Sequence, residues 1–156
     1  MQFISPRTRQ RAALLGGLTA LALALTGCSS FNRDYKKALL KGEPKNSIEG
    51  PWIGSWVSDK NSHHGELRGI ITQVEGNTYE TRFKAKFWGI FTYTSEAQFA
   101  MEPHNEGFEF FGTKKLGWLA GGEYTYEGRV SPEKFFSTYQ NKWDHGTFEM
   151  ERPSAK

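Results

Sequence analysis

The chain of 156 residues has a single cysteine, Cys28, so it cannot close an internal disulfide. It also lacks an apolar run of about 20 residues, the length that a membrane-crossing helix requires. Beyond residue 27 the chain has no excess of charge of either sign. The formal net charge of +3 comes from Arg7, Arg9 and Arg11, and 17 basic residues balance 17 acidic ones from Cys28 onward. Nucleic-acid binding is therefore not expected, because it needs a net basic field.

The composition is that of a folded, aromatic-rich chain. Aromatic residues make up 15% of the sequence, apolar residues 37% and charged residues 24%, and there are 17 glycines. These values exclude an intrinsically disordered chain and a helical coiled coil. The length is that of one domain, and the aromatic and glycine content favours a β protein.

The first 27 residues have the three-part layout of a secretory signal peptide. A basic segment reaches Arg11, the apolar stretch Ala12–Leu25 follows, and Thr26 and Gly27 lead to Cys28. The apolar stretch is too short for a spanning helix, so the pattern predicts that residues 1–27 are cleaved off. The alternatives are an ordinary signal peptide or an uncleaved anchor, each with an incidental cysteine.

The segment Leu25-Thr26-Gly27-Cys28 resembles the lipobox of bacterial lipoproteins, in which small residues precede the cysteine. The resemblance implies that Cys28 becomes the mature N-terminus and carries acyl chains on its sulfur and its amine. Two signals of this kind give stable membrane attachment. Ser29 stands where related lipoproteins of the inner membrane have an aspartate. The resemblance thus implies a lipid-anchored protein of the cell envelope, attached to the outer membrane and facing the periplasm.

Residues 28–49 form a mostly polar tether with one predicted short helix. Between Asp34 and Lys41 apolar residues recur at helical spacing, and Gly42 and Pro44 then end the helix. Two interpretations remain for this segment. It either plugs one end of the domain that follows or acts as a mobile linker, because a helix this short is marginal without packing.

From Gly50 onward apolar and polar residues alternate, and turn-forming residues interrupt the pattern. Eight strands are predicted, at Pro51–Ser58, Glu66–Glu75, Thr78–Phe87, Ile90–Met101, Gly107–Thr113, Trp118–Val130, Glu133–Lys142 and Gly146–Arg152. The connections are too short for crossover helices. Every strand should therefore run antiparallel to the one before it, within one domain of residues 50–153.

The alternation assigns one face of this meander to the core. In the third strand the charged residues Glu80, Arg82, Lys84 and Lys86 alternate with Tyr79, Thr81, Phe83, Ala85 and Phe87. A meander with one apolar face removes its exposed edges by closing on itself. The sequence thus predicts an all-β fold, an eight-stranded antiparallel up-and-down barrel, with a two-sheet sandwich as the alternative.

The first strand begins Gly50-Pro51-Trp52-Ile53-Gly54-Ser55-Trp56, which resembles the Gly-x-Trp entry of calycin barrels, the lipocalins and fatty-acid-binding proteins. The resemblance implies that Trp52 closes one end of the barrel and that an arginine packs across it. Pairing of the last strand with the first brings Arg152 beside Trp52. A guanidinium over an indole ring contributes about 0.5–2 kcal/mol.

Residue patterns typical of catalysis or metal binding are scarce. His63 and His64 lie near Asp59 and Glu66, but the spacing places no third metal ligand. Ser62 beside His63 does not form a catalytic triad, and no pair of carboxylates lies on the inner face. We therefore expect no catalytic residue, no metal site, no cofactor and no enzymatic activity.

Two functional interpretations remain. In the first, the barrel binds a small apolar or amphipathic ligand, without the loop histidines, through the inward residues Trp56, Thr81, Phe83, Tyr93, Ser95, Tyr124 and Tyr126. In the second, it is a solid, non-enzymatic scaffold that docks an envelope protein. Under both interpretations we expect a monomer that is attached to the membrane through acyl chains on Cys28. An enclosed cavity of about 300 Å³ or more would favour ligand binding, and interdigitated rings would favour the scaffold.

Overall fold

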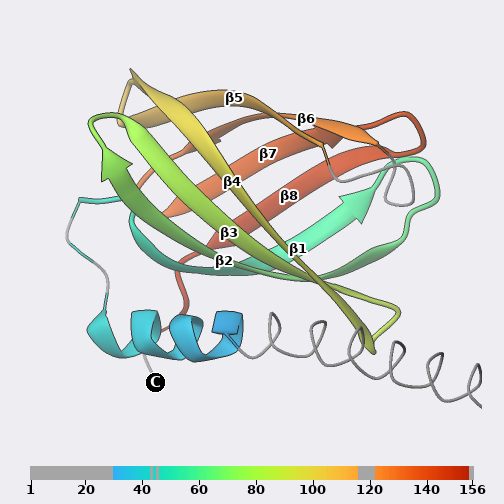
Figure 1. The fold of residues 1–156 in the computed structure, drawn as a ribbon, viewed down its shortest axis with the longest axis horizontal. Coiled ribbons are helices and arrows are strands. Elements are labelled where there is room, and N and C mark those ends of the chain that lie inside the picture. The colour runs from blue at the N-terminus through green and yellow to red at the C-terminus, as the bar shows by residue number, and fades with distance from the viewer. Residues whose placement is uncertain (1–29, 43, 45, 116–121, 155–156) are drawn as a thin grey trace, which may run out of the picture.

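A computed structural model of the protein describes residues 30–42, 44, 46–115 and 122–154. These residues form one helix and eight antiparallel strands that close into an up-and-down barrel (Figure 1). The strands are β1 Gly50–Ser58, β2 His64–Glu75, β3 Thr78–Phe87, β4 Phe91–His104, β5 Gly107–Lys115, β6 Glu123–Val130, β7 Lys134–Gln140 and β8 His145–Glu151. The predicted fold class is confirmed, and the closed barrel is consistent with a calycin-like fold.

Strand β4 is longer than predicted, because it runs past Met101 to His104 and includes Pro103. A central strand does not tolerate proline, which has no N–H to donate to a neighbour. Here β4 pairs with β3 only as far as Ala100, so at Pro103 the only paired neighbour is β5. The predicted start of the sixth strand falls in residues 116–121, outside the described residues.

The inner face of the barrel is the apolar face that the alternation predicted. Its buried rings pack directly on one another, and the centroids of Phe99 and Phe110 are 5.0 Å apart. Glycine makes this packing possible at one close approach. A Cβ atom at Gly112 would lie 2.5 Å from the Phe99 ring, so a larger residue on β5 would push that ring out of place.

One end of the barrel is closed by Trp52, which is fully buried. Its Nε1 donates to the carbonyl oxygen of Ile48 at 3.0 Å. The guanidinium carbon of Arg152 lies 4.0 Å from the centre of the indole ring. Arg152 also donates through Nη1 to the Glu49 carbonyl oxygen at 2.9 Å and through Nε to that of Pro132 at 2.7 Å. The arginine thus joins three separate chain segments over the tryptophan.

The N-terminal helix, residues 30–41, lies against the outer wall of the barrel below β2 and β3 (Figure 1). It neither plugs an end of the barrel nor hangs free. Phe31 and Tyr35 are buried against Ile70, an outward-facing residue of β2. The Tyr35 hydroxyl donates to the Trp52 carbonyl oxygen at 3.1 Å, which ties the helix to the closing strand.

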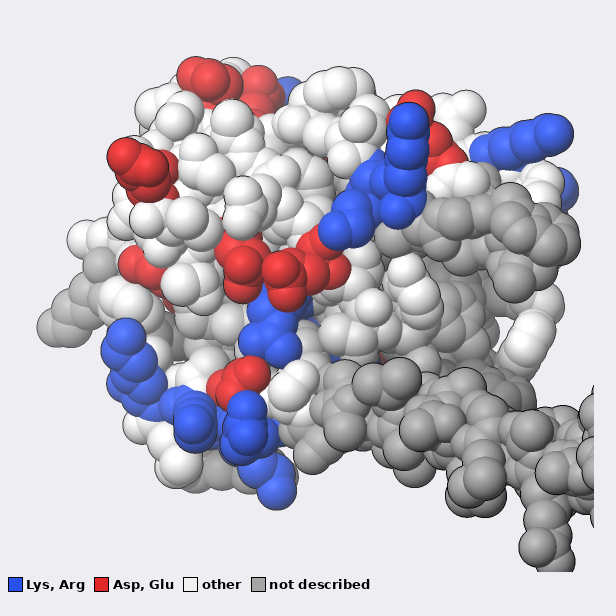
Figure 2. All heavy atoms as spheres, in the orientation of Figure 1, with Lys and Arg blue, Asp and Glu red and all other residues white. Residues whose placement is uncertain are grey.

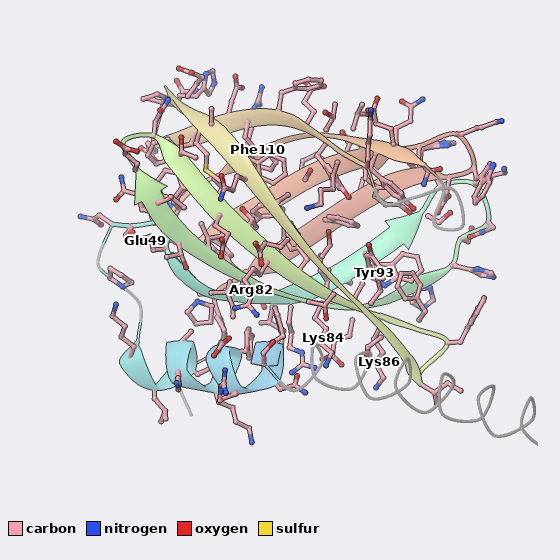
Figure 3. The ribbon with its side chains drawn as sticks, viewed as in Figure 1. Glu49, Arg82, Lys84, Lys86, Tyr93 and Phe110 are labelled. Carbon is pink, nitrogen blue, oxygen red and sulfur yellow. The ribbon has the colours of Figure 1, made fainter. Side chains whose placement is uncertain are left out.

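The helix also covers charged residues of β3 that the alternation placed in water. Arg82 makes an ion pair with Asp34 of the helix, with Nη1 and Oδ2 3.0 Å apart. Lys84 is only 6% exposed, and its Nζ donates to Asn32 Oδ1 at 3.1 Å. Figure 3 labels Arg82 and Lys84, which lie between the barrel and the helix. The outward direction of Lys84 was predicted correctly, but its exposure was not.

Phe31→Ala is expected to release the helix from the wall while the barrel stays folded. Removing a fully buried phenylalanine ring costs about 3–5 kcal/mol, and a short helix is not stable in water by itself. Hydrogen exchange should then show fast exchange across residues 32–41 and unchanged protection in β1–β8. Lys37→Ala, an exposed change on the same helix, is the control. Slow exchange of the helix in the Phe31 variant would contradict this packing.

Candidate ligand-binding cavity

The barrel interior is not filled at the end away from Trp52. A cavity of about 190 Å³ lies there, and its walls include residues from the β1–β2 and β7–β8 connections. The lining residues are Trp56, Asn61, His63, Leu67, Phe83, Ala85, Phe87, Tyr93, Ser95, Tyr124, Tyr126, Tyr139, Asp144 and Phe148. In Figure 3, Glu49 marks the closed end and Tyr93 lies toward the opposite, open end.

Six of the seven residues predicted to contact a ligand line this cavity. They come from four strands and are Trp56, Phe83, Tyr93, Ser95, Tyr124 and Tyr126. Thr81 is not among the lining residues. It is fully buried further along β3, toward the closed end, and its hydroxyl has no hydrogen-bond partner among the described residues.

Other lining residues were not singled out from the sequence. Tyr139 and Phe148 follow the same inward alternation in β7 and β8, so the pattern contained the signal for them. Asn61, His63 and Asp144 lie in connections, where alternation says nothing about direction. The β1–β2 connection brings His63, an exposed residue, to the edge of the cavity, and that the loop histidines play no part in binding stays a prediction.

Stacked and tilted aromatic rings form most of the cavity wall. The rings of Tyr139 and Phe148 stack with centroids 4.9 Å apart, and those of Tyr124 and Tyr126 stack at 6.0 Å. On the other side Trp56 packs against Phe87 at 4.6 Å. Such contacts hold each ring in place, so the wall is preformed rather than created by a ligand.

The polar groups of the cavity are mainly phenol hydroxyls. Burial raises the pKa of Tyr126, and the nearby hydroxyls of Tyr124 and Tyr93 raise it further. Burial also raises the pKa of Tyr93, and the nearby Ser95 side chain offsets part of that rise. These phenols therefore stay neutral at physiological pH and can both donate and accept hydrogen bonds.

Asp144 is the carboxylate at the open end, and three groups hold it. Its Oδ1 accepts hydrogen bonds from the Ser58 hydroxyl at 2.6 Å and from the His145 backbone N–H at 2.9 Å. Its Oδ2 accepts from the Tyr139 hydroxyl at 3.1 Å. Burial raises the pKa of Tyr139, and the Asp144 charge adds to that rise. The carboxylate is thus fixed in position next to the aromatic wall.

The size of the cavity limits what can enter. Drug-sized ligands occupy about 300–1,000 Å³, so about 190 Å³ suits a molecule on the order of ten non-hydrogen atoms. The cavity is smaller than the volume of about 300 Å³ that would favour ligand binding. It nevertheless shows that the rings do not fill the barrel as a solid core. A long acyl chain does not fit inside it.

The described part of the chain has neither a candidate metal cluster nor a helix that could span a membrane. No three His, Cys, Asp or Glu side chains gather there in a group that could hold a metal ion. No helix within the same ranges has the length and apolar character needed to cross a membrane. No protein family, curated protein or solved structure matches the chain. The likeness to calycins therefore rests on the Gly-x-Trp entry, the barrel topology and the Trp52–Arg152 contact.

Proposed function

We propose that this protein is an envelope lipoprotein whose barrel binds one small ligand in the cavity at its open end. The observation that carries the proposal is the cavity itself. It is lined by fixed aromatic rings and a few polar groups, and one end of the barrel is closed while the other reaches the surface. Small-molecule sites in proteins have this composition.

The membrane anchor belongs to the same proposal. Cys28 lies outside the described residues, but it precedes the helix by only a few positions. The exposed side of that helix carries Arg33, Lys36, Lys37 and Lys41, and Figure 2 shows basic side chains gathered over it. Basic residues next to a lipid anchor are attracted to anionic headgroups by about 1 kcal/mol each. Their position supports attachment through Cys28 with the helix close to the lipid surface.

The barrel's role in this proposal is binding without catalysis, and it needs no cofactor. The cavity lining includes Asp144, His63 and Ser95, but no hydrogen bond joins these three side chains. Asp144 bonds to Ser58 and Tyr139 instead, and the proposal gives it no proton-transfer task. All described lining residues belong to one chain, so the proposal needs no second protomer.

A ligand that enters the cavity is expected to change the fluorescence of Trp56 and to raise the melting temperature. A ligand at 100 times its Kd stabilises the folded state by about 2.7 kcal/mol, since it binds only the closed barrel. The experiment uses the chain from Ser29 to Lys156, which contains every described strand and the helix. Small aromatic, aliphatic and charged compounds are titrated into it.

Tyr124→Trp is the control, because a larger side chain fills part of the cavity and should weaken binding. Trp143→Phe alters an exposed tryptophan that does not line the cavity and should leave binding unchanged. If no compound of any class binds saturably, the ligand function is wrong.

The second candidate function is protein docking on the outer wall. A shallow depression of about 890 Å³ spans β4 to β7, and Phe111 and Phe136 are 65% and 44% exposed there. Exposed rings of this kind mark interaction sites in many proteins. A scaffold role would require that Phe111→Ser abolishes a function in the cell that Tyr124→Trp leaves intact.

A further inference from the structure

The charge of the cavity lining is one-sided. Asp144 is the only residue with a carboxylate among the described lining residues, and neither lysine nor arginine occurs among them. An anionic ligand in this cavity would meet a fixed negative charge and no cation to offset it, so anions are disfavoured.

The aromatic wall has the matching electrostatic character. Seven ring-bearing residues other than Phe83 and His63 surround the space, namely Trp56, Phe87, Tyr93, Tyr124, Tyr126, Tyr139 and Phe148. The face of an aromatic ring carries a partial negative charge, and several faces together attract a cation without hydrogen bonds. Aromatic cages of this kind recognise ammonium groups whose nitrogen bears methyl groups.

Asp144 acts on this same space rather than on the bulk solvent alone. Burial raises the pKa of Tyr139 and that of Tyr124, and the Asp144 charge adds to both rises, although Tyr124 reaches the cavity from a different strand. Tyr139 is also bonded directly to the carboxylate. The rings of these two tyrosines lie 6.2 Å apart. At that spacing the two rings contact each other, so a cation lies beside them in the cavity and not between them. There it is within the field of the carboxylate, which is already oriented by Ser58 and needs no rearrangement.

Lys60 and Lys114 are two of the lysines near the open end, and carbonyl oxygens hold both ammonium groups. Lys60 donates through Nζ to the Trp143 carbonyl oxygen at 2.7 Å. Lys114 belongs to the inward register of β5, but its Nζ donates to the carbonyl oxygen of Glu96 on β4. Neither lines the cavity. Their ammonium groups thus leave the interior to Asp144 and the rings.

From this arrangement we infer that the cavity selects a small organic cation, a methylated ammonium compound about the size of choline. The inference rests on the proposed ligand function and specifies its chemistry. The cation lies among the aromatic faces, the Asp144 carboxylate balances its charge, and the tyrosine and Ser95 hydroxyls bond to a polar group on the ligand. With about 190 Å³ available, the cavity accommodates such a molecule and excludes long-chain lipids.

The test compares three ligands of nearly equal shape and different charge on the Ser29–Lys156 protein. Choline is the cation. Its neutral carbon isostere is 3,3-dimethylbutan-1-ol (dimethylbutanol below), and the anion is 3,3-dimethylbutanoate (dimethylbutanoate below). Titration calorimetry at low salt is expected to give choline an affinity about tenfold or more above that of dimethylbutanol, and no binding of dimethylbutanoate. Equal affinity for choline and dimethylbutanol, or tighter binding of the anion, would overturn the inference.

Asp144→Asn removes the charge and keeps the shape of the side chain. It is expected to weaken choline binding about tenfold and to leave dimethylbutanol binding unchanged. Asp59→Asn is the matched control, the same chemical change on an exposed residue of the neighbouring connection that does not line the cavity. If Asp144→Asn fails to fold, the three-ligand comparison on the unaltered protein still decides.

The outcomes separate this inference from the proposed function. Binding of neutral compounds without preference for choline leaves ligand binding in place and rejects the cation. Absence of binding for all three ligands and for the wider compound set rejects both.

Discussion

Trp52→Ala is expected to lower the free energy of unfolding by about 3–5 kcal/mol, the range for removing a large buried ring. The indole is fully buried and packs against Phe135 with ring centroids 6.2 Å apart. Its removal also deprives Arg152 of the surface on which the guanidinium rests and Ile48 of a hydrogen-bond donor. Several stabilising contacts at the closed end are therefore lost together.

Chemical denaturation of the Ser29–Lys156 protein measures this effect. Trp88→Ala is the control, since Trp88 is also a tryptophan but is 75% exposed at the β3–β4 turn. An exposed change of this kind stays within about 0.5 kcal/mol. Equal losses in the two variants would mean that Trp52 does not close the barrel.

Cys28→Ala is expected to abolish lipidation completely and to leave the precursor uncleaved. The chain has no other thiol, so no other residue can take the thioether-linked diacylglyceryl group that the lipobox resemblance implies. The lipobox resemblance also implies that cleavage before the cysteine depends on this modification, so residues 1–27 should stay on the variant.

Metabolic labelling with palmitate and the apparent size of the chain in a bacterial host measure the result. The Cys28 variant should lose the label and keep the size of the precursor, whereas Ser30→Ala, a nearby change that keeps the thiol, should be labelled and cleaved. Palmitate on the Cys28→Ala protein would show that the anchor has been assigned to the wrong residue.

The sequence determined the barrel almost by itself. Alternation over residues 50–153 identifies which side of each strand faces inward, and short connections require antiparallel neighbours. With eight such strands and one apolar face, closure follows from the cost of exposed edges. Even the position of Arg152 against Trp52 follows, because closing the barrel pairs the last strand with the first.

The place of the helix was decided only by the tertiary structure. Helical spacing indicates that residues near Tyr35 form a helix, but not what covers its apolar side. The partner is Ile70, a single apolar residue on the outward register of β2, and one such residue has no recognisable pattern in the sequence. The docked helix also buries Lys84 of β3. The alternation in β3 correctly indicated that Lys84 points outward, but not that the helix covers it.

The cavity likewise depended on the folded structure. Alternation shows that Tyr126 faces inward, but not whether the rings around it meet, because the empty volume depends on the side-chain conformations of many residues at once. The charge in the cavity comes from Asp144 in the β7–β8 connection, and His63 reaches its edge from the β1–β2 connection. The path of a connection has no two-residue repeat. The sequence therefore determined which way each strand residue points. Only the packed barrel decided how much space remains between the side chains and which groups from the connections reach that space.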